Sequence, residues 1–279
     1  MHLSVPPDLS ALILTANEEA NIDRTLAALH WVPSILVIDS GSTDATLAIL
    51  GSYPSVRVLH RPFDSFAGQT NFGLSHLDSA WVLSLDADYL ITPSLAQEIT
   101  TSIASAADDL AGFSIPFRYC VAGRPLRATL LPPRTALYRR HGRRHPARYI
   151  DDGHSHRVQI DGRLGHLHQP ILHDDRKPLS RWLESQRRYL PIEAAKLLAT
   201  PSRQLSSADR LRRDTPLAPL AVLVLCLVFK AGLLDGWRGC FYAGQRVYAE
   251  LLLLLLLVEA RRFPSPISSG PTLNRRSTL

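Results

Sequence analysis

Short apolar runs alternate with polar, helix-compatible segments along the first 90 residues of the chain. Apolar runs of strand length occupy residues 10–15, 35–38, 56–59 and 81–85. The segments that separate them carry apolar residues at helical spacing, and Asn17 stands where it could cap the first of these helices. This alternation predicts an α/β fold in which a mostly parallel sheet has helices on both faces.

Three of the predicted strands end in polar clusters. The clusters are Thr15-Ala16-Asn17-Glu18, Asp39-Ser40-Gly41-Ser42 and Asp86-Ala87-Asp88. Parallel strands point the same way, so all three clusters should lie at one edge of the sheet, where open α/β sheets bind ligands. Asp86 and Asp88 supply two hard oxygen donors that suit Mg²⁺ or Mn²⁺ together with phosphate oxygens. The alternative for an isolated pair of this kind is a polar turn that closes a strand.

Charge narrows the class of partner. The chain has 279 residues and a formal net charge of +6, which favours an acidic partner such as nucleic acid, anionic lipid or a phosphorylated ligand. Residues 113–150 contain nine arginines and no acidic residue. These arginines are Arg118, Arg124, Arg127, Arg134, Arg139, Arg140, Arg143, Arg144 and Arg148. The segment is interpreted as an anion-facing surface, with an ordinary solvated face as the alternative.

Histidines and carboxylates are dense from residue 151 to residue 175, in DDGHSH and then in HDD at 173–175. This density of potential ligands is compatible with a metal site. The spacing matches no zinc motif, however, so surface loops are an equal alternative. Residues 177–198 are predicted to form a helix.

Two strongly apolar segments, 216–234 and 247–258, follow with basic residues on both sides. The first is barely long enough to span a bilayer and the second is too short, so an interfacial or re-entrant helix pair is expected. A buried helical hairpin that caps the preceding domain is the alternative. The expected organisation is a catalytic domain (1–175), a helical connector (176–215), an apolar membrane-associated hairpin (216–262) and a disordered tail (263–279).

Four motifs in order resemble the inverting glycosyltransferases of family 2, and in particular bacterial enzymes that build lipopolysaccharide core or other lipid-linked glycans. The motifs are TANEE (15–19), DSGSTD (39–44), FAGQTNFGL (66–74) and WVLSLDADY (81–89). The segment 232–252 also resembles the membrane-associated C-terminal part of those enzymes.

This resemblance implies a GT-A fold, a nucleoside-diphosphate sugar donor, and Mg²⁺ or Mn²⁺. The donor-binding residues that it implies are Thr15, Asn17, Glu18, Glu19, Asp39, Ser40, Ser42, Gln69, Asn71 and Asp86. Asp39 would bind the base, and Asp86 would face the ribose or the waters of the metal. Asp88 would bind the metal between the two phosphates, and His173 or His156 would complete the metal shell.

Inverting transfer also needs a base that takes the proton of the acceptor hydroxyl. Related sequences often carry a Val-His-Glu-like element where this chain has Gly-His-Ser-His at 153–156, so the expected glutamate is missing. Asp152 is the first candidate for the base, with Asp151 and His154 as alternatives.

The leading hypothesis is therefore a metal-dependent glycosyltransferase with an anionic lipid-linked acceptor at the cytoplasmic face of the inner membrane. A catalytically degenerate nucleotide-sugar-binding protein is the alternative. Nucleic acid is not expected as a partner, because aromatic residues are not interleaved with a basic strand face.

Overall fold

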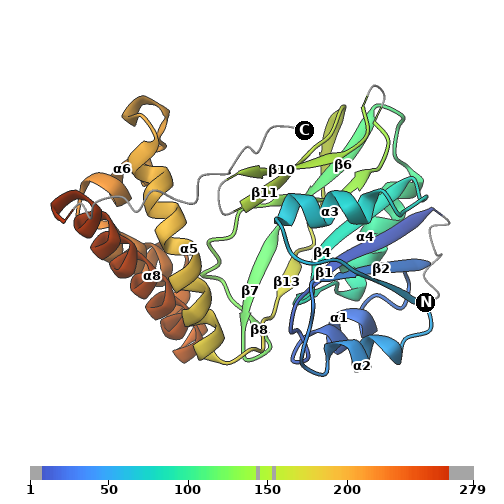
Figure 1. Cartoon of the computed structure of the whole chain (residues 1–279), viewed down its shortest axis with the longest axis horizontal. Helices are drawn as coiled ribbons and strands as arrows, with labels where there is room; N and C mark the ends of the chain where they lie inside the picture. The colour runs from blue at the N-terminus through green and yellow to red at the C-terminus, as the bar shows by residue number, and fades with distance from the viewer. Residues whose placement is uncertain (1–7, 143–144, 153–154, 264–279) are drawn as a thin grey trace, which may run out of the picture.

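The computed structural model describes residues 8–142, 145–152 and 155–263. Within this range the chain forms an α/β unit and a helical unit, which lie side by side in Figure 1. The α/β unit includes the three strand ends that were predicted to carry the site.

A seven-stranded sheet with the order β12-β6-β9-β4-β1-β2-β3 forms the centre of the α/β unit. β1, β2, β3 and β4 run parallel, whereas β9 is antiparallel to its neighbours β4 and β6. The strands are β1 (Leu9–Thr15), β2 (Ser34–Asp39), β3 (Val56–His60), β4 (Trp81–Asp86), β6 (Leu110–Ile115), β9 (Arg134–Arg139) and β12 (Arg163–His166). The predicted α/β fold with a mainly parallel sheet is confirmed.

Helices cover both faces of this sheet (Figure 1). Along β1, Ala11 and Ile13 belong to the core that includes α1 (Ile22–Ala27) and α4 (Pro93–Ala104). Leu12, between them in the sequence, points to the other face, where α3 (Phe66–Leu74) packs. Successive strand residues face opposite sides, so a strand buried on both faces must be apolar throughout.

Smaller elements complete the α/β unit. One is a four-stranded sheet in the order β5-β13-β7-β8, and another is the hairpin of β10 and β11, which contacts α3. Their bounds, with the remaining helix, are α2 (Thr46–Gly51), β5 (Tyr89–Leu90), β7 (Phe117–Val121), β8 (Arg124–Pro125), β10 (Arg148–Asp152), β11 (Ser155–Gln159) and β13 (Ile171–His173).

The helical unit follows β13 and packs back onto the α/β unit. Its elements are α5 (Leu179–Ala199), η1 (Ser202–Gln204), α6 (Ser207–Asp214), α7 (Ala218–Val224), the π-helical turn η2 (Leu225–Phe229), η3 (Gly232–Asp235) and α8 (Trp237–Arg262). The hydroxyl of Tyr242 on α8 accepts a hydrogen bond from the backbone N–H of Leu130 at 3.1 Å. Asp235 accepts another from the N–H of Arg127 at 2.8 Å. The hairpin is therefore docked, although much of its apolar surface remains exposed.

The second apolar segment, 247–258, was expected to be too short to cross a bilayer. The helix that contains it, α8, is longer than the segment itself. α8 has 26 residues and begins at Trp237, well before the predicted segment 247–258. Polar residues in its first half, such as Arg238 and Arg246, are good helix formers and do not interrupt the helix. By length and composition alone, α8 is the one helix of the described residues that could cross a membrane, and a core helix can pass the same test. The expected disordered tail lies outside the described residues from residue 264 onward.

Candidate active site

The strand ends meet as predicted, and Asp39 is the most enclosed of their acids. Its carboxylate is fully buried and accepts hydrogen bonds from the Thr15 hydroxyl at 3.1 Å and the Ser42 hydroxyl at 2.5 Å. The backbone N–H groups of Gly41 and Ser42 donate to its other oxygen at 2.9 and 3.0 Å. Burial alone would raise the pKa of Asp39, but these hydrogen bonds outweigh it and lower the pKa below 3.8.

The loops after β1 and β2 brace each other. The N–H of Asn17 donates to the Ser42 hydroxyl at 2.9 Å, and the N–H of Thr43 donates to the Asn17 side chain at 2.8 Å. Glu19 accepts a hydrogen bond from the N–H of Ala45 at 3.0 Å. The expectation that Asn17 caps a helix is wrong. Asn17 has φ +57° because the chain turns there toward the second loop, and α1 starts only at Ile22.

Glu18 belongs to a buried polar network that the sequence analysis missed. Its carboxylate lies 2.6 Å from Lys177 Nζ and 2.9 Å from the side-chain amide of Asn21. Burial raises the pKa of Glu18 even though the Lys177 cation acts in the opposite direction. Arg24 on α1 in turn pairs with the buried Asp174 at 2.6 Å. The mixed-charge run after residue 173 is the signal that could have pointed to this network.

Ser40, Gln69 and Asn71 form hydrogen bonds that fix α3 beside the strand ends. The buried Gln69 amide donates to the Ser40 hydroxyl at 3.3 Å and to the backbone oxygen of Arg61 at 2.9 Å. Asn71 exchanges two hydrogen bonds with the backbone of Tyr149, at 2.9 and 2.8 Å. Both side chains thus hold α3 against its neighbours, and the residue of α3 that lines the adjacent cavity is Thr70.

The DAD motif divides its two aspartates between two environments. Asp86 lines an open cavity, whereas the nearly buried Asp88 lies 3.0 Å from His173 Nε2 on β13. Burial disfavours charge on both groups, but their mutual attraction wins, so that the pKa of Asp88 is lowered and that of His173 is raised. Each of the two groups therefore favours the charged form of the other.

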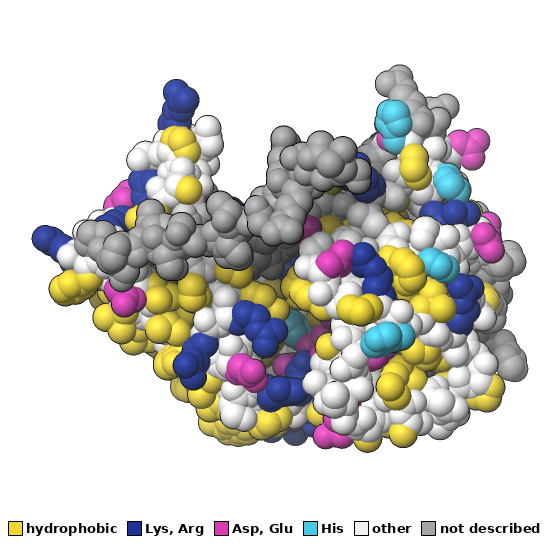
Figure 2. Space-filling model, in the orientation of Figure 1, with side chains coloured by type: hydrophobic (Ala, Val, Ile, Leu, Met, Phe, Trp, Pro, Cys, Tyr) yellow, Lys and Arg dark blue, Asp and Glu magenta, His cyan; other side chains and the backbone are white. Residues whose placement is uncertain are grey.

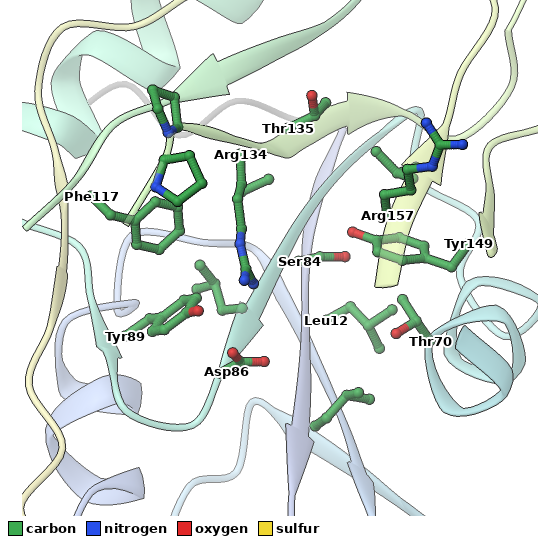
Figure 3. Close-up of a pocket in the computed structure, with 16 residues that line it drawn as sticks. Leu12, Thr70, Ser84, Asp86, Tyr89, Phe117, Arg134, Thr135, Tyr149 and Arg157 are labelled. Carbon is green, nitrogen blue, oxygen red and sulfur yellow. The ribbon is translucent and has the colours of Figure 1, made fainter. Parts of the chain in front are cut away.

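The cavity beside Asp86 has a volume of about 420 Å³ (Figure 3). Its lining combines hydroxyl groups, aromatic rings and two arginines. These residues are Thr70, Ser84, Tyr89, Phe117, Arg134, Thr135, Tyr149 and Arg157. Hydroxyls and a carboxylate beside aromatic faces suit a sugar-sized ligand.

The candidates for the base lie on or beside the hairpin of β10 and β11. Asp151 is exposed, and its carboxylate accepts a hydrogen bond from the N–H of Ala67 at 3.1 Å. Asp152 is the last residue of β10 and pairs with Ser155, whereas His154 lies outside the described residues. His156 pairs in register with Asp151.

A divalent cation would find only part of its ligands in the protein. Among the residues that the structure describes, no three His, Cys, Asp or Glu side chains are arranged to hold a metal. However, Asp88 Oδ1 is buried and has no hydrogen-bond partner in that part of the chain. Mg²⁺ is commonly held by one or two carboxylates together with substrate phosphates, so Asp88 and Asp86 fit a cation that a diphosphate would complete.

Comparison with known proteins agrees with this geometry. The family model for glycosyl transferase family 2 matches residues 10–161, which is more than half of the chain. The chain belongs to glycosyl transferase family 2. The resemblance read from the four motifs is thereby confirmed, and with it the GT-A type of α/β fold.

Curated relatives match the family 2 domain over part of their length. The lipopolysaccharide core biosynthesis glycosyltransferase LpsC of Rhizobium meliloti (strain 1021) is 32% identical over 119 residues, which are 41% of this chain and 44% of LpsC. An uncharacterized glycosyltransferase of Rickettsia felis is 35% identical over 102 residues, which are 36% of each protein. The matched segment thus spans less than half of either relative.

Solved structures are more distant. S. aureus TarS 1-349 in complex with UDP-GlcNAc is 15% identical, covers 91% of both chains and has a TM-score of 0.47. Glucosyl-3-phosphoglycerate synthase from Mycobacterium tuberculosis in complex with phosphoglyceric acid is 17% identical. The match covers 70% of this chain and 81% of the synthase chain, with a TM-score of 0.46.

Proposed function

We propose that this family 2 protein transfers a sugar, with inversion, from a nucleoside-diphosphate sugar to an anionic lipid-linked or lipopolysaccharide-type acceptor. The observation that carries the proposal is the meeting of Asp39, Asp86 and Asp88 at one sheet edge. Leu14 on β1 pairs with Asp86, and Thr15 on the same strand pairs with Asp39, so β1 alone separates the two acids. A cavity opens beside Asp86.

The nucleoside would bind at the rim formed by the loops after β1 and β2. Asp39 is held ionised there by its hydrogen bonds, and a carboxylate can accept hydrogen bonds from the N–H groups of a base. Thr15 and Ser42 fix the carboxylate, and Ser40 with the Asn17–Glu19 loop forms the surrounding wall. Gln69 and Asn71 act indirectly, by fixing α3.

Mg²⁺ or Mn²⁺ would be held by Asp88 and Asp86 together with the donor phosphates, and His173 would orient Asp88, because no three metal-ligating side chains come together among the described residues. When bound, the cation neutralises charge that develops on the leaving diphosphate.

Transfer requires attack of an acceptor hydroxyl on the anomeric carbon while a base removes the hydroxyl proton. Asp152 remains the first candidate for that base, with Asp151 on the same strand and His154, outside the described residues, as alternatives. The hydrogen bond from Ala67 to Asp151 ties this hairpin to α3.

The acceptor would be reached from the cytoplasmic face of the inner membrane. Figure 2 shows apolar side chains gathered along the outer edge of the helical unit, with basic side chains between them and the α/β unit. Phe229 and Leu234, at the turn between α7 and α8, are 77% and 72% exposed. Such a surface suits peripheral or re-entrant insertion beside anionic headgroups.

Thermal unfolding of the full chain with UDP-, GDP- and dTDP-sugars, each with and without Mn²⁺, tests the donor assignment. One donor should raise the melting temperature in a metal-dependent way, because a ligand of the native state stabilises it by mass action. Donor hydrolysis or transfer would then identify an enzyme. Binding without turnover would instead favour the catalytically degenerate nucleotide-sugar-binding protein, and no binding of any donor would contradict both.

A further inference from the structure

Arg134 extends from the start of β9 into the cavity, toward Asp86 and Tyr89 (Figure 3). Its guanidinium makes no hydrogen bond or ion pair with any residue that the structure describes. An arginine has five N–H donors in a planar fork that matches carboxylate and phosphate groups. Because no described residue forms a hydrogen bond or ion pair with it, this guanidinium is available to an anion from outside the chain.

Two later arginines of the same run serve the fold instead. Arg139 donates to the backbone oxygen of Leu110 at 2.9 Å and lies 4.6 Å from the centre of the Trp81 ring. Arg140 donates to the backbone oxygen of Ser79 at 3.2 Å. The expectation that the whole run faces an anion is therefore too broad, since Arg139 and Arg140 bind backbone oxygens whereas Arg134 lines the cavity.

Sheet order decides which part of the substrates Arg134 can meet. Along the edge the strands come in the order β2, β1, β4 and β9, so Asp39 and Arg134 stand at opposite ends of this series. Three strand spacings separate them, roughly 14 Å. If the nucleoside lies at Asp39 and the diphosphate at Asp88, Arg134 lies on the far side of the transferred sugar, where the acceptor must approach.

The rest of the cavity suits a sugar ring that carries such an anion. Tyr89, Phe117 and Tyr149 offer aromatic faces, and Ser84 and Thr135 offer hydroxyls. A second arginine, Arg157, lies at the opposite rim with its guanidinium turned outward (Figure 3).

We infer that this cavity binds an acceptor glycosyl unit bearing a phosphate or carboxylate, and that Arg134 is the residue that binds this anionic group. The inference rests on the proposed function, because it takes the acceptor side from the proposed place of the donor. Arg134 would set acceptor specificity, whereas Asp39 and Asp88 would hold the donor.

Binding of small acid sugars to the full chain tests the inference. Glucose 6-phosphate and glucuronate present the two candidate anions, and glucose presents neither. Calorimetry at millimolar ligand should show binding of at least one acid sugar to the wild type and about tenfold weaker binding to Arg134→Gln. Glucose should bind both proteins equally weakly. Arg134→Lys, which keeps the charge but loses the fork, should fall between them.

The matched control is Arg118→Gln, which removes an exposed arginine of β7 that does not line the cavity. This variant should bind the acid sugars like the wild type. Equal binding of the acid sugars by Arg134→Gln and the wild type, or no binding by the wild type, would overturn the inference.

UDP binding with Mn²⁺ separates this result from the fate of the proposed function. If Arg134→Gln binds UDP normally but loses the acid sugar, both assignments stand. If it loses UDP instead, Arg134 contacts the donor and the acceptor assignment is wrong. If the wild type binds neither UDP nor any other nucleotide, the proposed function itself fails.

Discussion

Asp88 Oδ2 and His173 Nε2 lie 3.0 Å apart, although the two residues are 85 positions apart in the chain. The ring of Tyr119 contacts the imidazole with a centroid distance of 4.9 Å, and the N–H of Asp174 donates to the backbone oxygen of Asp88 at 3.0 Å. These contacts join β13 to the end of β4. The pairing keeps Asp88 ionised in a site where burial alone would favour its neutral form.

Replacement of Asp88 by asparagine should remove metal-dependent donor binding. The variant keeps the size of the side chain but loses the charge that a cation needs, so transfer should fall at least about 100-fold. The Mn²⁺-dependent rise in melting temperature with the nucleotide should also disappear. Asp108→Asn, at an exposed carboxylate away from the site, is the matched control and should behave like the wild type. Full activity of Asp88→Asn with the correct donor would rule out the metal role.

Asp39 should make the stability of the protein depend on pH in the acid range. Its folded-state pKa is lower than the ordinary value of 3.8, so its stabilising contribution is complete above that value. The contribution is lost as the pH falls through the folded-state pKa. At neutral pH, Asp39→Asn should cost about 1–3 kcal/mol, because its amide cannot accept all of these hydrogen bonds.

Urea unfolding of the wild type and Asp39→Asn between pH 7 and strongly acidic conditions measures this dependence. The difference between the two proteins should shrink below pH 3.8. Asp78→Asn, at an exposed position, should show no comparable difference. A difference that stays constant with pH would mean that the ionised form of Asp39 is not what the hydrogen bonds stabilise.

The sequence was sufficient for the four parallel strands β1 to β4 and for the acids at the ends of β2 and β4, because both depend on local patterns. Strands such as β1 are buried on both faces and therefore read as apolar runs, and the polar residues after Thr15, Asp39 and Asp86 mark where burial stops. Parallel pairing then brings these ends together.

Local patterns of this kind do not predict contacts between segments that are distant in the sequence. The pairing of Arg24 with Asp174 joins residues 150 positions apart, and no periodicity links them. The roles of Gln69 and Asn71 depend on which backbone groups lie opposite α3. Arg134 differs from Arg139 and Arg140 only in what surrounds it, so composition could identify the basic run but not the member that lines the cavity.

Asn71 should contribute to stability more than an exposed helix residue usually does. Its amide satisfies both the N–H and the carbonyl oxygen of Tyr149, and so links α3 to β10. Asn71→Ala would leave both backbone groups without that partner and should cost about 1–3 kcal/mol in urea unfolding. Ser75→Ala, at the end of the same helix, is the control and should cost less. An equal loss of unfolding free energy in the two variants would show that the link from Asn71 to Tyr149 does not hold the hairpin of β10 and β11 against α3.

The exposed turn between α7 and α8 should determine membrane binding. Transfer of an apolar side chain out of water is worth about 1.5–3 kcal/mol, so Phe229→Ser with Leu234→Ser should weaken liposome binding at least about tenfold. Vesicles with anionic lipid are the appropriate probe, because Lys230 lies within this turn and Arg238 follows it, and each basic residue adds about 1 kcal/mol near such a surface. Leu47→Ser, at a residue of α2 that is 47% exposed, is the control and should pellet with the vesicles like the wild type. Nucleotide binding should be unchanged in both variants, since none of the three residues belongs to the proposed donor site. Undiminished pelleting of the double variant, with its fold intact, would mean that this hairpin faces something other than lipid.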